Sequence, residues 1–172
     1  MLKKIAITGP ESTGKSDLAK ALAKHYNTQW VPEYAREYID NLNRPYRYED
    51  IEQIARGQLK IEKQKEATAS SLIICDTEFL VTKIWSEYVF GQCSQWILDQ
   101  VKHHTYDLYL LMDIDLPWQD DPQREHPHKR QELFSIYKQE LVNNGFDFRI
   151  VSGYGAKRIN NAIKYINELI NI

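Results

Sequence analysis

The sequence predicts an α/β protein with a five-stranded parallel sheet that is covered by helices on both faces. Five short apolar runs alternate with longer amphipathic stretches, and no repeat or low-complexity linker interrupts them. The 172 residues suit one domain, over 1–172, with its own core. Helices between short apolar strands imply right-handed crossovers and parallel neighbours. Ligands of such a sheet bind beyond the carboxyl ends of its strands.

The five apolar runs are each too short for a helix, and most of them end at glycine, proline or an acidic residue. We expect strands over 3–8, 28–31, 72–75, 108–112 and 148–151.

Helices are expected between these strands, because apolar residues there recur at helical spacing. One stripe consists of Leu18, Ala19, Leu22, Ala23 and Tyr26, and another, on a longer charged helix, of Ile51, Ile54, Gln58 and Ile61. Further helices are expected over 79–89, 95–103, 129–143 and 156–170.

Charge and composition narrow the class of partner. The net charge of −2 comes from 22 basic and 24 acidic residues that are mixed along the chain, which disfavours nucleic acid as a partner. No apolar stretch approaches membrane-spanning length and no signal peptide is recognisable, so we expect a cytoplasmic protein without membrane contact. Cys75 and Cys93 lack metal-ligand or redox spacing and are expected as reduced, structural thiols. The composition says nothing of the oligomeric state.

Residues 9–16 read GPESTGKS, which matches the phosphate-binding P-loop pattern G-x-x-x-x-G-K-[ST] between an expected strand and an expected helix. Glycines let such a loop wrap a phosphate, and the helix N-terminus favours the anion. Lys15 is expected to reach the β- and γ-phosphates of ATP, and the Ser16 hydroxyl to bind Mg²⁺. The residues expected to contact the nucleotide are Gly9, Glu11, Ser12, Thr13, Gly14, Lys15 and Ser16.

Asp76 follows the third apolar run, where a carboxylate would enter the ligand crevice. An acid at this position can hold a water of hydrated Mg²⁺ and so take part in phosphoryl transfer. The alternative is that Asp76 only caps the following helix.

Residues 33–38 read EYAREY and follow the second strand, at the same edge of the sheet. Glu33 could accept the proton of an acceptor hydroxyl, Arg36 could anchor a phosphate, and Tyr34 could flank a flat ring. The alternative is a set of ordinary ion pairs on a helix surface.

Residues 113–130 lack a hydrophobic period and change from acidic to basic, as a mobile lid over phosphates would. Arg124 or Arg130 is expected to stabilise charge on the transferred group. Trp118 and Asp120 are candidates for binding the acceptor. The alternative is a solvated loop whose arginines pair with its own aspartates.

The loop 152–158 follows the last strand and has two glycines, which would let the backbone approach a flat ring. We expect the adenine of ATP there, beside Tyr154; the alternative is a plain turn. No Asn-Lys-x-Asp motif is present, which argues against a GTPase. The residues alone thus indicate a P-loop kinase with an acidic and aromatic acceptor site, or a nucleotide-binding regulatory module.

The combination of motifs resembles the ribosylnicotinamide kinase domain of the NadR proteins over nearly the whole chain. The resemblance rests on the P-loop GPESTGKS, the segment EYAREY, the segment DTEF at 76–79, and PW-x-DD-x-x-R at 117–124. It implies the nucleoside-kinase-like P-loop fold, with nicotinamide riboside as acceptor and nicotinamide mononucleotide as product. It also implies that the Trp118 region lies near the base, with Arg36, Asp76 and Arg124 near the reacting phosphates. NadR proteins further contain an adenylyltransferase domain and often a DNA-binding domain, which have no counterpart in these 172 residues.

Overall fold

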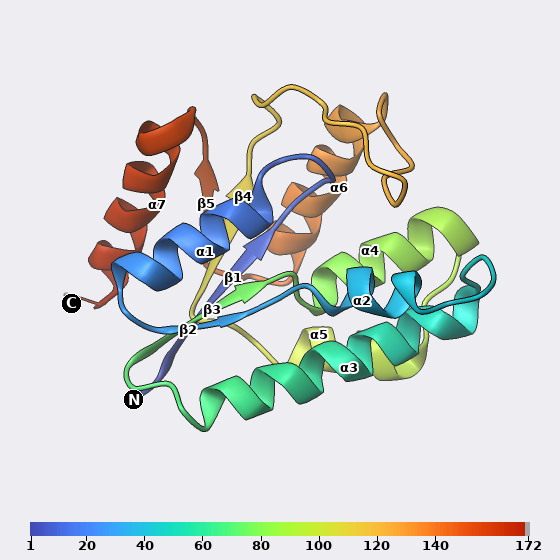
Figure 1. The fold of residues 1–172 in the computed structure, drawn as a ribbon, viewed down its shortest axis with the longest axis horizontal. Helices are drawn as coiled ribbons and strands as arrows, with labels where there is room; N and C mark the ends of the chain where they lie inside the picture. The colour runs from blue at the N-terminus through green and yellow to red at the C-terminus, as the bar shows by residue number, and fades with distance from the viewer. Residues whose placement is uncertain (171–172) are drawn as a thin grey trace.

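Five parallel strands form one sheet at the centre of the protein, in the order β2-β3-β1-β4-β5 (Figure 1). The structure is a computed structural model and describes residues 1–170. The predicted strands are confirmed, with a shift of one residue at the start of β2 and at the end of β3. Their bounds are β1 Lys3–Thr8, β2 Gln29–Val31, β3 Leu72–Asp76, β4 Leu108–Met112 and β5 Phe148–Val151.

Seven helices are described in residues 1–170, and those predicted agree with the structure to within one residue at each given end. The seven-residue helix α2, which contains most of the EYAREY segment, is additional. None of these helices has the length and apolar composition needed to cross a membrane. Their bounds are α1 Lys15–His25, α2 Tyr34–Asp40, α3 Tyr48–Glu66, α4 Phe79–Phe90, α5 Gln95–His103, α6 Arg130–Asn143 and α7 Gly155–Ile170.

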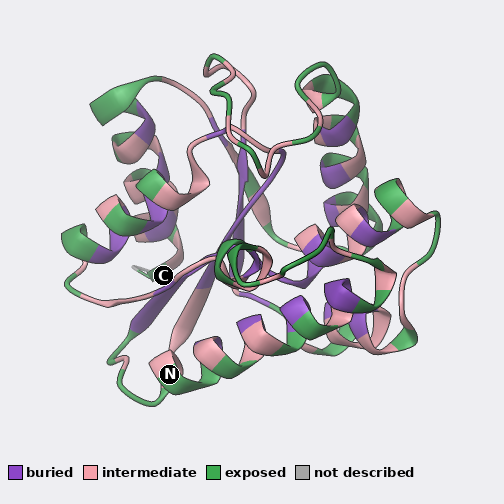
Figure 2. Cartoon of the chain, turned by 45° about the vertical axis from the view of Figure 1, so that its right-hand side comes forward, coloured by how far each residue is buried: buried purple, intermediate pink, exposed green. Residues whose placement is uncertain are grey.

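Each face of the sheet is buried by a different set of helices (Figure 2). Alternation along β1 sends Ile5 and Ile7 to the face that α1 and α7 cover, and Ala6 to the face that α3, α4, α5 and α6 cover. Strands β3 and β4 are buried at every position. The faces of β3 and β4 are therefore closed to solvent, whereas the edge strands β2 and β5 are partly exposed.

At the amino end of the sheet, a buried carboxylate joins three elements. Glu62 of α3 is fully buried and accepts hydrogen bonds from Tyr106 Oη at 2.7 Å and Lys4 Nζ at 3.0 Å. His104 Nε2 lies 2.6 Å from the same carboxylate. Burial by itself would raise the pKa of Glu62, but His104 and the Lys4 charge outweigh it and hold the pKa at about 2. Glu62 therefore stabilises the fold as an ion.

We predict that Glu62→Gln lowers the free energy of unfolding by about 2 kcal/mol at pH 7, because Lys4 loses its buried anionic partner and keeps only the partly exposed Glu66, at 3.1 Å. The pKa of Glu62 in the folded protein lies below its ordinary value of 4.5. The ionised Glu62 therefore stabilises the fold above pH 4.5, and this stabilisation is lost as the pH falls toward 2. The variant should therefore lose less stability than wild type between pH 5 and pH 3. Urea unfolding at both pH values measures this, with the exposed Glu132→Gln as control. Parallel losses in wild type and Glu62→Gln would contradict the prediction.

Candidate active site

The loop between β1 and α1 has the backbone geometry of a phosphate cradle. Gly9 and Gly14 have φ values of 133° and 78°, which favour glycine. A Cβ on Gly9 would also lie 3.3 Å from the backbone N and O of Met112, so a side chain there would crowd β4. Helix α1 begins directly after Gly14, which has no side chain to cap the first N–H groups. Those N–H groups are therefore available to an anion.

Two polar side chains of α1 lie against this loop and the end of β3. Lys15 Nζ donates to the carbonyl oxygens of Gly9 at 3.0 Å and Pro10 at 2.8 Å. Ser16 Oγ donates to Asp76 Oδ2 at 2.5 Å. Burial and the negative charge of Glu33 raise the pKa of the buried Asp76 carboxyl to about 6.

The second carboxylate oxygen of Asp76, Oδ1, is buried and has no hydrogen-bond partner among residues 1–170. An orphaned buried oxygen of this kind needs a ligand, a proton or a cation. Carboxylate and hydroxyl oxygens are the ligands that Mg²⁺ prefers, so the Asp76 and Ser16 pair fits that ion.

Helix α4 is capped by Glu78, and the alternative role of Asp76 as its cap is wrong. Glu78 Oε2 accepts from Leu80 N at 2.6 Å, and Oε1 accepts from Thr8 Oγ1 at 2.9 Å. The side chain is buried, and burial raises the pKa of this carboxyl to about 7. The sequence signal was an acid directly before an apolar helical run, which is a usual capping position.

A cavity of about 720 Å³ extends from the phosphate loop to α4 and α6. Besides the loop, six parts of the chain contribute to its wall. They are α1 with Asp17 and Lys20; residues 30–46, which contribute Trp30, Pro32, Glu33, Ala35, Arg36, Ile39, Arg44, Pro45 and Tyr46; Asp76 at the end of β3; α4 with Val81, Ile84, Trp85, Tyr88 and Val89; the segment between β4 and α6; and α6 with Leu133 and Tyr137.

Glu33 and Arg36 both line this cavity, at the start of α2. The proximity of Glu33 to Asp76 is evident in the raised pKa of Asp76. Arg36 pairs with Asp121 Oδ2 at 3.0 Å, so it binds the segment between β4 and α6 and not its own helix. Asp76 therefore lies near Glu33 and Asp121 near Arg36, although the members of each pair are remote in sequence.

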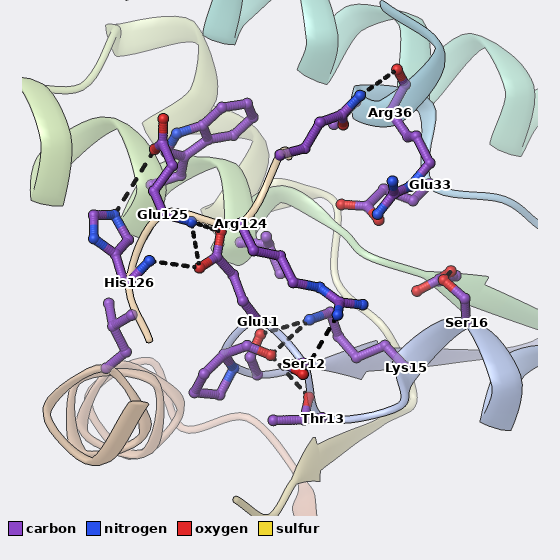
Figure 3. Close-up of a pocket in the computed structure, with 18 of the residues that line it drawn as sticks. Glu11, Ser12, Thr13, Lys15, Ser16, Glu33, Arg36, Arg124, Glu125 and His126 are labelled. Carbon is purple, nitrogen blue, oxygen red and sulfur yellow. Dashed lines mark hydrogen bonds and ion pairs between the residues drawn. The ribbon is translucent and has the colours of Figure 1, made fainter. Parts of the chain in front are cut away.

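The segment 113–130 lies over the phosphate loop, and its backbone N–H groups donate hydrogen bonds to side chains of that loop (Figure 3). The Glu11 carboxylate accepts from Glu125 N and His126 N, both at 3.1 Å. Ser12 Oγ accepts from Gln119 N at 2.8 Å. Side chains of the loop thus hold this lid segment in contact with it.

The two lid arginines differ in their surroundings. Arg124 lines the cavity and donates to Gln119 O at 2.5 Å, and its Nη1 lies 3.5 Å from Ser12 Oγ (Figure 3). Arg130 donates to the carbonyl oxygens of Ser12 at 3.1 Å and Leu116 at 2.8 Å. Neither forms an ion pair with an aspartate of the lid. Arg124 is therefore the arginine that could meet a ligand, whereas Arg130 fastens the lid to the loop.

Three aromatic side chains form the wall of the cavity away from the phosphate loop. Trp85 packs edge to face with Tyr46, with ring centroids 5.0 Å apart, and Tyr88 lies in the next turn of α4. Tyr46 Oη accepts from Trp85 Nε1 at 3.2 Å and donates to Glu125 Oε2 at 2.6 Å. Sequence reasoning missed all three aromatics, because Trp85 and Tyr88 at helical spacing and Tyr46 in the loop before α3 are indistinguishable from core residues.

The cavity wall does not include three side chains that the sequence suggested for the acceptor site, which are Trp118, Asp120 and Tyr34. Trp118 Nε1 donates to Asp120 Oδ1 at 2.8 Å, and the Arg130 guanidinium lies 5.8 Å from the indole centroid. Tyr34 packs on Gly57 of α3, where a Cβ would lie only 1.9 Å from Tyr34 Cε1. These three side chains contact neighbouring protein groups and not the cavity.

Tyr154 is 62% exposed, also lies outside the cavity wall, and donates its hydroxyl to Asp115 O. The buried Arg158 organises the loop around Tyr154. Arg158 Nη2 donates to Thr13 O at 3.0 Å and to Asp113 O at 2.9 Å. The loop 152–158 is therefore joined to the phosphate loop through a guanidinium.

Comparison with known proteins agrees with this geometry. The sequence model of a family described as AAA domain matches residues 4–158. The trifunctional NAD biosynthesis/regulator protein NadR of Escherichia coli (strain K12) is 26% identical over 155 residues, which are 86% of this chain and 37% of that protein. The chain thus spans 37% of the length of this curated relative. The resemblance to NadR is confirmed.

Solved structures extend the likeness to the fold. A crystal structure of NadR in complex with NR has a TM-score of 0.82 at 22% identity, covering 99% of this chain and 52% of that one. Another, of NadR in complex with NAD and AMP-PNP, has a TM-score of 0.77 at 22% identity, with 99% and 50% covered. A deoxyadenosine kinase from M. mycoides has a TM-score of 0.61 at 16% identity, with 96% and 99% covered. The predicted nucleoside-kinase-like P-loop fold is confirmed.

We predict that Glu11→Ala loosens the lid, because Glu125 N and His126 N lose a charged acceptor. A hydrogen bond to a charged group contributes about 1.5 kcal/mol or more, so these two amides should exchange with deuterium about tenfold faster. Amide hydrogen exchange of the free protein measures it. The control is Glu132→Ala, which removes the exposed partner of Lys129 on α6. Equal exchange in Glu11→Ala and wild type would show that the carboxylate does not hold the lid.

Proposed function

This chain belongs to the AAA domain family of P-loop proteins, and from that premise we propose that it is an ATP-dependent kinase for a hydroxyl of a small nucleoside, foremost nicotinamide riboside. The observation that most supports this proposal is the continuous cavity, with a phosphate cradle at one end and an aromatic wall at the other. Its volume of about 720 Å³ falls within the range of small-molecule sites. A donor and a planar acceptor could thus meet within one enclosed space.

On the donor side, the free N–H groups at the start of α1 would bind the phosphates of ATP. Lys15 donates to two loop carbonyls, and a phosphate oxygen would be a stronger acceptor for its charge. Ser16 and Asp76 would hold Mg²⁺, which neutralises charge on phosphate oxygens when bound.

On the acceptor side, Glu33 would accept the hydroxyl proton, since it lines the cavity near Asp76. Arg36 and Arg124 would stabilise negative charge on the phosphoryl group in transit. All three belong to the wall of one cavity, although β3 and β4 lie between Arg36 and Arg124 in the sequence.

The aromatic wall supports a planar acceptor base. The nicotinamide ring of the riboside is flat and positively charged, and an indole face attracts such a ring through both stacking and its π-electrons. Trp85 lines the cavity, and Trp118 lies in the lid outside it. The NadR protein crystallised in complex with NR supports the same acceptor, and the NadR complex with AMP-PNP supports ATP as donor.

The proposal predicts acceptor-dependent release of ADP from MgATP, fastest with nicotinamide riboside among nicotinamide riboside, adenosine, thymidine and thiamine. Lys15→Met should reduce kcat by about 100-fold to 1000-fold, because it removes a charge aimed at the transferred phosphate. A coupled ADP assay measures both, with circular dichroism to verify folding. Release that never exceeds the acceptor-free rate would reject a kinase, and faster turnover of another acceptor would reject only nicotinamide riboside.

The cation-binding role of the aromatic wall predicts a change in selectivity. A desolvated cation–π contact contributes about 2 kcal/mol, so Trp85→Leu should lower the ratio of kcat/KM for nicotinamide riboside over adenosine by about 10-fold to 30-fold. Trp118→Ala provides the matched comparison, because this second indole is the one that the sequence predicts beside the base. A drop with Trp118→Ala alone would place the base against the lid, and no drop in either variant would contradict indole recognition.

A further inference from the structure

The turn between β3 and α4 has an unusual backbone. Thr77 takes a φ of 74°, in the left-handed region that β-branched residues rarely adopt. Its N–H donates to Ile7 O at 3.1 Å, and its buried Oγ1 has no hydrogen-bond partner within residues 1–170. Such a conformation costs of order 1–3 kcal/mol and persists only where the surroundings enforce it. Something beyond local preference therefore sets this turn.

The strained turn separates two acids with different surroundings. Asp76, on one side, lines the cavity; Glu78, on the other, does not. Glu78 instead joins two elements through one buried carboxyl, since it accepts from Thr8 Oγ1 at 2.9 Å and from Leu80 N at 2.6 Å.

The two partners of Glu78 adjoin different segments of the cavity wall. Thr8 is the last residue of β1 and directly precedes Gly9, the first residue of the phosphate loop. Leu80 lies in the first turn of α4 and directly precedes Val81, the first cavity residue of that helix. The same helix then places Trp85 and Tyr88 on the aromatic wall. One carboxyl thus bridges the base of the donor loop and the base of the acceptor wall.

If the contact between Glu78 and Thr8 served only to stabilise the fold, an apolar contact would do so at a lower desolvation cost. Capping α4 requires only the bond to Leu80 N, and a buried polar pair such as Glu78 with Thr8 is stabilised less readily than an apolar pair of the same size. What the hydroxyl–carboxyl bond adds is a fixed distance and direction between β1 and α4. Phosphoryl transfer is sensitive to such a spacing, because a displacement of about 1 Å can cost about 100-fold in rate.

We infer that Glu78, through its hydrogen bond with Thr8, is a positioning residue that holds the phosphate loop at a fixed spacing from the acceptor wall on α4. This inference rests on the proposed kinase function for its effect on rate, but the mechanical coupling can be measured without any acceptor. Neither Glu78 nor Thr8 needs to touch a substrate.

The direct test uses AMP-PNP with Mg²⁺ and amide hydrogen exchange. In wild type, binding of AMP-PNP should slow exchange in the phosphate loop and also in the first turn of α4, residues 80–83. In Thr8→Val the protection of the loop should remain, whereas the protection of 80–83 should fall by more than half. Thr8→Ser, which keeps the hydroxyl, should behave as wild type. Thr28→Val is the matched control, because Thr28 Oγ1 donates to Leu72 O at the amino end of the sheet.

The kinetic test separates positioning from capping. Thr8→Val and Glu78→Gln should lower kcat by about 10-fold to 100-fold, with the Kd for ATP and the acceptor KM within about threefold of wild type. Thr28→Val should lower only the Tm.

Several outcomes would overturn the inference. Undiminished protection of residues 80–83 in Thr8→Val would do so. A kcat that falls in proportion to the Tm in Thr8→Val, Glu78→Gln and Thr28→Val alike would also overturn it. If Thr8→Val fails to fold, a loss of coupling in Thr8→Ser would count against it as well. Wild type that binds AMP-PNP and shows the coupling but transfers to no acceptor would reject the kinase proposal and leave the coupling standing. Wild type that does not bind AMP-PNP would reject both.

Discussion

The pairing of β1 with β3 is the constraint on which the site depends. In their parallel register Ile7 lies opposite Asp76, so the two strands end side by side. The phosphate loop leaves one strand and the carboxylate of Asp76 ends the other, and Ser16 donates a hydrogen bond to that carboxylate across the gap. Both strands contribute side chains to the cores on both faces of the sheet, and a slip of one residue would exchange those two sets, for example the small Ala6 with the larger Ile5 and Ile7, so packing fixes the register.

Buried carboxyls at the two ends of the sheet have pKa values shifted in opposite directions. At the amino end, Glu62 is surrounded by Lys4, His104 and Tyr106, which lower its pKa. At the carboxyl end, Asp76 and Glu78 have their pKa raised, chiefly by burial, and within residues 1–170 neither carboxyl bonds to a lysine, arginine or histidine side chain. The same chemical group is thus held as an ion at one end of the sheet and has a raised pKa at the other. Environments that push pKa values apart in this way are typical of functional sites.

The lid illustrates how a polar segment acquires a fixed place. Residues 113–130 have little apolar surface to bury, and it is the carboxylate of Glu11 and the hydroxyl of Ser12 that bind lid backbone N–H groups. Arg36 adds a contact from α2 through Asp121. Because Glu11 and Ser12 belong to the phosphate loop, a nucleotide bound there would meet the lid directly, and lid position and nucleotide binding are linked through shared residues.

The sequence by itself determined the fold and, within the candidate site, the phosphate loop and the polar residues at the strand ends. Apolar periodicity located all five strands to within one residue, and the GPESTGKS loop, Asp76, Glu33 and Arg36 follow from motif and strand-end position, which are local properties of the chain. Only the tertiary structure decided the aromatic part of the candidate site. Trp85 lies on α4 and Tyr46 in the loop before α3, and both look like core residues until these segments pack together, whereas Trp118, conspicuous in a polar loop, lies outside the cavity wall. Glu78 likewise read as part of a motif, and its link to Thr8 spans 70 residues. Local sequence patterns determine where each strand ends. The set of side chains that line one cavity depends instead on contacts between distant segments, which no local pattern records.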